Sequence, residues 1–377
     1  MPGEILAQNS SDAPLCQRCG TEAATHNVRS EDVCSNCFSQ YVQTKTIKRM
    51  ETYRIRGSSA KTPRKLLFPL SFGPSSASLL HILDQHLRGQ YDRMKRTSYE
   101  LYVVHINVYV DPVDRKDADE MLEKYKTRYP RHNYAIFNLE EALGLDGIDW
   151  KALGLENSDS MAPSAERLQK LLGSMSSATS RSDIVSTLLA RLLVDVAKRN
   201  SCEGTLFGDS TTRLAEKTLT ETAKGRGFSL PWQISDGTSP HGITFYYPLR
   251  DILKKEIMSF STLTSPPLTD LIVQPHPTSQ ISASSKLTTI DDLMAQYFES
   301  VEENFPSIVA NVVRTTSKLQ SLPNETTEAC GLCGLPVAVG TDGIHGWGGD
   351  QNSESRPGKD DTYHGILCYG CSRSMNS

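Results

Sequence analysis

The sequence predicts an α/β protein with a doubly wound parallel sheet and a zinc-ribbon-like module at each end of the chain. Short apolar runs alternate with amphipathic stretches through the middle of the sequence, which is typical of strands alternating with crossover helices. Four Cys-x-x-Cys pairs lie near the two ends. With 377 residues, 38% of them hydrophobic, the chain is long enough for one full core and small satellite modules.

The first module is predicted over residues 1–44. Its two cysteine pairs stand in "CQRCGTEAATHNVRSEDVCSNC", with 14 residues between the pairs, close to the spacing of a zinc ribbon. Gly20 follows the first pair directly, where a knuckle turn favours glycine. We therefore expect one metal ion on four thiolates, those of Cys16, Cys19, Cys34 and Cys37.

A basic stretch follows, with a linker predicted over residues 45–64. Between residues 45 and 65 there are eight Lys or Arg residues and one acid, Glu51. Such a density of positive charge can bind phosphates, although a solvated helix and linker have the same composition. The candidate RNA-binding residues are Lys45, Lys48, Arg49, Arg54, Arg56, Lys61, Arg64 and Lys65.

The α/β domain is predicted over residues 65–260. The run 66–70 is continuously apolar, as expected for a parallel strand covered on both faces. Leucines at helical spacing then predict a helix over 75–87, and Ser210 is an expected helix cap. The further strands are expected at 99–110, 134–139 and 204–209, and the further helices at 118–129, 181–198 and 210–227.

The remainder of the chain is predicted as a Ser/Thr/Pro-rich loop, a helical segment and a second cysteine module. The loop spans 261–287, the helical segment spans 288–327 with helices near 290–304 and 307–319, and the module spans 328–377. The last two cysteine pairs are 34 residues apart around a glycine-rich, acidic insert. The expected ligands of a second metal ion are Cys330, Cys333, Cys368 and Cys371.

Cysteine usage and charge restrict the chemistry. Paired thiols in a reducing compartment are more often metal ligands than disulfides, so we expect two structural zinc ions; an iron–sulfur cluster or a redox dithiol is the alternative. The unpaired Cys202 is expected in the core. A formal charge of −4 argues against a uniformly basic nucleic-acid binder, and no apolar run is long enough to span a membrane. A cytosolic or nuclear location follows.

Three segments in order resemble those of the PP-loop ATP pyrophosphatases that thiolate tRNA. A strand ends in "SFGPSS" and starts a helix, a later strand ends in "FGDSTTRLAEKTL", and "YPLRDILKKEI" follows. Flanked by four cysteine knuckles, this order resembles most closely the second-subunit branch of that family, from the eukaryotic cytosolic tRNA 2-thiolation complex. The resemblance implies a PP-loop, adenine-nucleotide-hydrolase-like fold and a cytoplasmic location.

The chain departs from the residues that carry the family's chemistry. Family members have Ser-Gly-Gly-x-Asp-Ser in the phosphate loop, where this chain has Ser71, Phe72, Gly73, Pro74, Ser75 and Ser76. Phe72 adds bulk where the backbone approaches phosphate, Pro74 offers no N–H, and Ser75 brings no charge. After the fourth strand the chain has Asp209-Ser210-Thr211-Thr212 where the family has His-Asn-Ala-Asp-Asp, so the acidic pair is missing, and residues 173–184 contain no cysteine.

The resemblance and these departures imply a non-catalytic subunit that binds no ATP. Its partner would be a catalytic PP-loop paralogue, and the pair would thiolate wobble uridine 34 of the lysine, glutamine and glutamate tRNAs with sulfur from a ubiquitin-related modifier. The zinc modules and the basic run would contact tRNA phosphates. Two alternatives stay open: an enzyme that adenylates tRNA with Ser71, Gly73 and Ser76, and a zinc scaffold with no RNA role.

Overall fold

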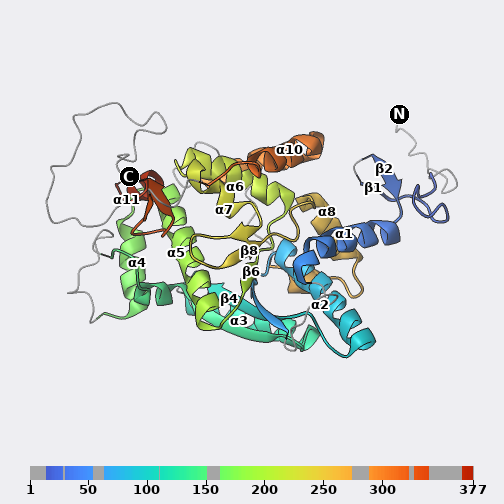
Figure 1. Cartoon of the computed structure of the whole chain (residues 1–377), viewed down its shortest axis with the longest axis horizontal. Coiled ribbons are helices and arrows are strands. Elements are labelled where there is room, and N and C mark those ends of the chain that lie inside the picture. The colour runs from blue at the N-terminus through green and yellow to red at the C-terminus, as the bar shows by residue number, and fades with distance from the viewer. Residues whose placement is uncertain are drawn as a thin grey trace, which may run out of the picture.

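The molecule has a central sheet with helices on both faces (Figure 1). One group of four cysteines lies toward each end of the chain. The computed structural model describes residues 14–28, 30–53, 63–109, 111–150, 162–273, 288–321, 327–338 and 367–376. Among these residues, no helix combines the length and the apolar character that a membrane span requires.

The central sheet has six strands in the order β5-β4-β3-β6-β8-β7. All neighbouring pairs are parallel except β7 and β8. The strand order reverses direction between β3 and β6, so the carboxyl ends of these two strands flank the crevice where open α/β sheets bind ligands. The strands are β3 (Arg64–Pro69), β4 (Tyr99–Asn107), β5 (Asn133–Asn138), β6 (Gly204–Leu206), β7 (Gly237–Thr238) and β8 (Thr244–Tyr246).

The apolar run in β3 forms the boundary between the two main cores. Leu66 and Phe68 belong to one cluster of buried side chains and Leu67 to the other, and all three are fully buried. Successive side chains of a strand point to opposite faces, so a strand covered on both faces must be apolar throughout. The doubly wound parallel sheet predicted from the sequence is therefore confirmed.

Helices from distant parts of the sequence cover the two faces. In Figure 1, α1 and α2 lie on one side of the sheet and α4 and α5 on the other. A third cluster of buried residues joins α6, α7, α9 and α10. The helices are α1 (Ser35–Arg49), α2 (Pro74–Met94), α3 (Pro112–Arg128), α4 (Ser164–Ser174), α5 (Ala178–Arg199), α6 (Thr211–Ala223), α7 (Leu230–Gln233), α8 (Lys254–Leu263), α9 (Ile290–Asn304), α10 (Pro306–Thr316) and α11 (Tyr369–Asn376).

Several elements differ from the sequence prediction. The helix expected at 118–129 begins at Pro112, because Asp111 caps it by accepting a hydrogen bond from the N–H of Val113 (2.8 Å). The loop predicted over 261–287 is partly wrong, since α8 continues to Leu263 and a 3-10 turn spans Thr269–Leu271; residues 274–287 lie outside the described part. The helices α1, α4, α7, α8 and α11 and the strands β7 and β8 were not predicted from the sequence. The domain boundaries stay predictions.

Candidate functional site

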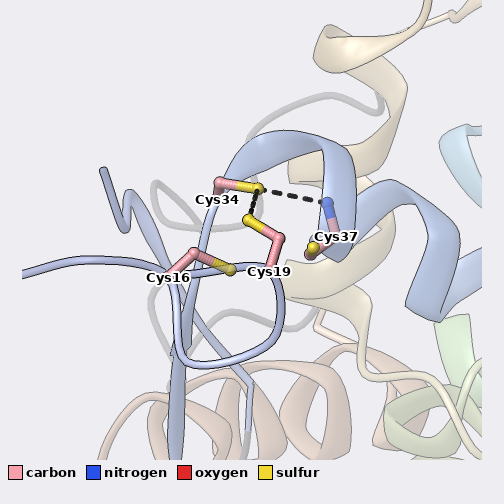
Figure 2. Close-up of side chains that lie close together, drawn as sticks. All are labelled: Cys16, Cys19, Cys34 and Cys37. Carbon is pink, nitrogen blue, oxygen red and sulfur yellow. Dashed lines mark hydrogen bonds between the residues drawn. The ribbon is translucent and has the colours of Figure 1, made fainter. Parts of the chain in front are cut away.

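The first four cysteines converge from a turn and from the start of a helix. Cys16 and Cys19 lie in a turn that precedes the hairpin of β1 (His26–Val28) and β2 (Glu31–Val33), and Cys34 and Cys37 open α1. Cys34 is the N-cap of this helix, and its sulfur accepts a hydrogen bond from the N–H of Cys37 (3.4 Å). Figure 2 shows the four side chains meeting between the turn and the helix.

The sulfur positions suit one tetrahedral metal ion. The Sγ atoms of Cys19 and Cys34 are 3.8 Å apart, and all four sulfurs lie within 4.8 Å of one another. A tetrahedron with metal–sulfur bonds of about 2.3 Å has sulfur–sulfur edges of about 3.8 Å. A multi-iron cluster would set irons and sulfides between the thiolates and hold them further apart. The geometry therefore favours one ion over the iron–sulfur alternative.

The last four cysteines form a second group of the same kind. Cys330 and Cys333 lie between β9 (Thr327–Ala329) and β10 (Pro336–Ala338), and Cys368 and Cys371 lie at the start of α11. The Sγ atoms of Cys333 and Cys368 are 3.9 Å apart, and all four sulfurs again lie within 4.8 Å of one another. All four cysteines are buried and belong to the same core cluster as α5.

Hydrogen bonds favour the thiolate form of one cysteine in each group, whereas the hydrogen bonds with Cys330 raise the pKa of Cys333 and of Cys371. Hydrogen bonds from Thr21 and from the backbone of Glu22 lower the pKa of Cys19 to about 6. In the second group, hydrogen bonds from the other three thiols hold the pKa of Cys330 well below its usual range, and the N–H of Cys368 donates to its sulfur (3.3 Å). Metal ions bind the thiolate form of cysteine. The spacing of the four sulfurs in each group is what allows it to hold one divalent ion.

The candidate phosphate loop, residues 71–76, joins β3 to α2 at the reversal point of the sheet. Phe72 has a φ of +58°, the left-handed conformation that glycine adopts without strain. Its ring is buried and stacks on His105 (ring centroids 4.1 Å apart) and on Tyr125 (5.6 Å). The ring thus packs into the core instead of adding bulk to the phosphate side of the loop, contrary to the sequence expectation.

The loop satisfies its own polar groups and packs closely against the loop after β6. The Ser71 and Ser76 hydroxyl groups lie 3.1 Å apart, and the Ser76 hydroxyl donates to the carbonyl of Gly73 (3.1 Å). Pro74 is the first residue of α2, so one backbone donor is missing there. A Cβ atom on Gly208 would lie 3.2 Å from the Ser76 Cα, so this second loop lies against the first turn of α2.

Thr211 and Thr212, in the segment where the family's acidic pair is missing, hold neighbouring segments together. Thr211 donates a hydrogen bond to the carbonyl of Arg250 (2.7 Å). Thr212 donates to the Glu302 carboxylate (2.8 Å) and accepts from the N–H of Lys254 (3.0 Å). Glu302 is buried and belongs to α9, so this position links α6, α8 and α9. Sequence reasoning missed Glu302 because nothing in its surroundings along the chain marks it.

Cys202 lies in the second core cluster. The residue is 5% exposed, and burial raises the pKa of its thiol. A thiol with a raised pKa is a poor nucleophile. The prediction that Cys202 is a core residue is confirmed.

The basic run is split between α1 and β3. Arg54, Arg56 and Lys61 lie outside the described residues. Arg49 pairs with Asp251 (2.6 Å), Arg64 lies 3.7 Å from Glu203, and Lys65 stacks over the Tyr102 ring (4.7 Å from its centroid). Lys48 is exposed on α1, and the Lys45 ammonium lies 5.9 Å from the centroid of the Tyr41 ring on the same helix.

Comparisons with known proteins agree with this architecture. The family model described as cytoplasmic tRNA 2-thiolation protein 2 matches residues 289–373, which include α9, α10 and the second cysteine group. In fold, the chain is similar to the U34-tRNA thiolase NcsA from Methanococcus maripaludis, solved with its 4Fe-4S cluster. The TM-score is 0.57, with 16% identity over 85% of this chain and 92% of the thiolase.

Two relatives named cytoplasmic tRNA 2-thiolation protein 2 match over most of their length. The protein from Sclerotinia sclerotiorum is 64% identical over 83% of this chain and 82% of its own. The protein from Phaeosphaeria nodorum is 49% identical over 100% of this chain and 97% of its own. With the PP-loop-like sheet and the paired cysteine groups already described, these matches show that the chain belongs to the cytoplasmic tRNA 2-thiolation protein 2 family.

Proposed function

We propose that the chain is the non-catalytic subunit of a heterodimeric tRNA-uridine 2-sulfurtransferase. It supports thiolation of wobble uridine 34 in the cytosolic lysine, glutamine and glutamate tRNAs by binding tRNA and a catalytic PP-loop paralogue. Sulfur reaches the pair from a ubiquitin-related modifier. Its family is named for tRNA 2-thiolation, and its cytoplasmic location, predicted from the sequence, is the one stated in the family name.

The observation that carries the non-catalytic assignment is the state of the loop between β3 and α2. A phosphate loop needs free backbone N–H groups at the helix start and a nearby acid for the metal ion. Here Pro74 removes a donor, Ser75 brings no carboxylate, and the backbone of Gly208 lies against Ser76. Thr211 and Thr212 are engaged in structural hydrogen bonds. These features support a subunit that does not activate the uridine with ATP.

Two structural zinc ions belong to this proposal. Four thiolates at tetrahedral spacing are the donor set that zinc prefers in structural sites, and all four positions are filled by protein ligands. Zinc in such a site would hold together segments that are too small to fold on a core of their own. It would have no open position for substrate.

A calorimetric titration tests the non-catalytic assignment. The full chain, loaded with zinc, is titrated with ATP and magnesium, and the catalytic paralogue is titrated in parallel as the positive control. We expect no heat of binding from this chain at micromolar ATP. One observation favours the alternative, an active adenylating enzyme. Phe72 has the left-handed backbone conformation that a glycine would have in a phosphate loop, so the turn itself is kept. Micromolar binding together with adenylate formation by this chain alone would establish that alternative.

The salt dependence of tRNA binding tests the RNA contact. Lys45 and Lys48 lie on α1, the helix that carries two ligands of the first cysteine group. Affinity falls as salt rises, and each lost phosphate contact makes the negative slope of log affinity against log salt shallower by about 0.7 to 0.9. The double variant Lys45→Gln, Lys48→Gln should therefore make the slope shallower by about 1.5.

The matched control removes the same charge from α3. Lys116 and Lys124 are both exposed on that helix, so the double variant Lys116→Gln, Lys124→Gln changes the net charge equally. This control should leave the slope unchanged. Equal slopes for the two double variants and the parent chain would support the zinc scaffold without an RNA role.

A further inference from the structure

The turn that carries Cys330 and Cys333, here called the first knuckle of the second cysteine group, is covered by Arg191 from α5. Gly334 follows Cys333 and has a φ of +70°. The space that a Cβ atom on Gly334 would need is taken by the Nη1 atom of Arg191, with the ring carbon Cε1 of His241 2.9 Å from the same point. The guanidinium therefore lies directly over the knuckle backbone.

The other contacts of Arg191 fix the position of its guanidinium. The Nη2 atom donates to the carbonyl oxygens of Asp146 (3.1 Å) and Gly147 (3.2 Å). Both acceptors are uncharged, and among the described residues no carboxylate pairs with Arg191 within salt-bridge distance. Burial lowers the pKa of Arg191, and the charges of Cys333, Cys330 and Asp195 act in the opposite direction and favour the charged guanidinium. Its positive charge is thus available to the cysteine group.

The second knuckle, the turn that carries Cys368 and Cys371, also contacts an arginine, but this arginine is paired with carboxylates. Arg226 packs on Gly370, which precedes Cys371. Its charge is matched by Asp183, which it contacts through both terminal nitrogens, and by Glu221 (2.8 Å). The hydroxyl of Ser374 on α11 donates to the same Asp183 carboxylate (2.6 Å). This arginine anchors α11 to the domain, but its charge is already balanced.

A metal ion bound by four thiolates needs a positive counter-charge nearby, and Arg191 can supply it. Four thiolates around a divalent ion carry a net charge of −2, and burying that charge without a counter-charge is costly. Two backbone N–H groups, those of Cys368 and Cys371, donate to cysteine sulfurs and offset part of the cost. We propose that Arg191 is the counter-charge of a metal ion held by the second cysteine group, and that it fixes the orientation of the first knuckle. This inference rests on the proposed metal site.

The test measures the metal itself, in the full chain. Substitutions Cys19→Ser and Cys37→Ser remove the first site, so that cobalt(II) reports only the second. Cobalt bound by thiolates gives a charge-transfer absorption band, and a chelator then withdraws the ion at a measurable rate. On this background we compare Arg191→Gln and Arg191→Lys. The matched control is Arg199→Gln, which removes a charge from the same helix where Arg199 pairs with Asp195.

We expect Arg191→Gln to speed cobalt release about tenfold, the lower end for residues that support metal ligands. The charge-transfer band should move to lower energy, because the thiolate electrons lose a nearby positive charge. Arg191→Lys should keep most of the parent behaviour, and Arg199→Gln should match the parent. Circular dichroism confirms that each variant is folded.

The other outcomes overturn the proposal in distinguishable ways. A band and a release rate in Arg191→Gln within twofold of the parent would show that Arg191 does not compensate the metal charge. Equal acceleration in the Gln and Lys variants would leave packing alone as its role. Absence of the charge-transfer band in the parent itself would refute the metal site on which the inference rests.

Discussion

In both cysteine groups a glycine after the first pair takes a left-handed φ, +66° for Gly20 and +70° for Gly334. Each donates its N–H to the carbonyl of the first cysteine of its group, at 2.8 Å to Cys16 and 2.9 Å to Cys330. The surroundings differ. A Cβ atom on Gly20 would meet nothing within 4 Å, whereas the same atom on Gly334 would collide with Arg191. The same left-handed glycine turn thus has free space around it in the first group and is closely packed against Arg191 in the second.

The difference in surroundings indicates that a metal ion would have a different structural role in each cysteine group. In the first group Cys16 and Cys34 are buried in a core cluster, but Cys19 is exposed and Cys37 is partly exposed; in the second group all four cysteines are buried in a core cluster. An ion in the first group would order a small hairpin beside the lysines of α1. An ion in the second group would be part of the core that also contains α5 and the strand residue Leu67.

The largest expected effect comes from removing one ligand in each group. Cys371→Ser should lower the free energy of unfolding of the zinc-loaded chain by about 3 kcal/mol or more, because a buried ligand set loses its ion inside the core. Cys37→Ser should alter only the hairpin and the start of α1. Urea unfolding followed by far-ultraviolet circular dichroism measures both variants. Equal shifts of the two midpoints would contradict the contrast between the groups.

A smaller effect is expected from adding one methyl group to each knuckle glycine. Gly20→Ala should weaken cobalt binding at the first site about fivefold, the cost of a left-handed alanine. Gly334→Ala has the same backbone cost and must also displace Arg191, so about a hundredfold loss is expected at the second site. Competition with a chelator measures both affinities. Equal losses would mean that Arg191 moves aside at little cost.

The smallest expected effect is on the pH dependence of the unfolding free energy. Acid releases metal from both cysteine groups because thiolates take up protons, so the test has to separate this release from the acid sensitivity of the domain itself. Burial, with a smaller contribution from the charge of Arg128, lowers the pKa of His81 to about 4. In the unfolded chain this pKa is about 6.5, so the unfolded state binds the proton first as the pH falls. The stability contributed is complete above pH 6.5 and is lost on the way down to pH 4.

His81→Gln removes this titrating group. Between pH 7 and pH 5.5 the parent should lose about 1 kcal/mol more unfolding free energy than the variant. Urea unfolding at the two pH values gives the difference, in which metal release cancels because both chains carry both cysteine groups. An identical pH dependence in parent and variant would show that His81 does not carry the proton linkage.

Patterns local in the sequence predicted most of the fold. The cysteine spacing predicted which four thiols meet in each group, because a knuckle is a short turn whose geometry depends on neighbouring residues. The apolar run of β3 and the cap at Ser210 were also readable, since the periodicity and the capping group are properties of the segment itself. The three-residue strand β8 was not predicted.

Contacts between distant segments were not predictable. The ring of Phe72 turns into the core because His105 and Tyr125 form a stacking site there, and nothing near residue 72 in the sequence reveals it. The same holds for Gly208 against Ser76 and for Arg191 over Gly334. The substituted residues of the motif therefore did not predict where the new side chain goes.

Formation of 2-thiouridine in tRNA by purified components tests the central claim most directly. With ATP, the sulfur-loaded modifier and tRNA, this chain alone should form none, and the chain with its paralogue should form it. The double variant Ser71→Ala, Ser76→Ala in this chain should leave the rate of the folded pair unchanged. Thiouridine formed by this chain alone, or a rate abolished by that double variant in an intact complex, would contradict a non-catalytic role.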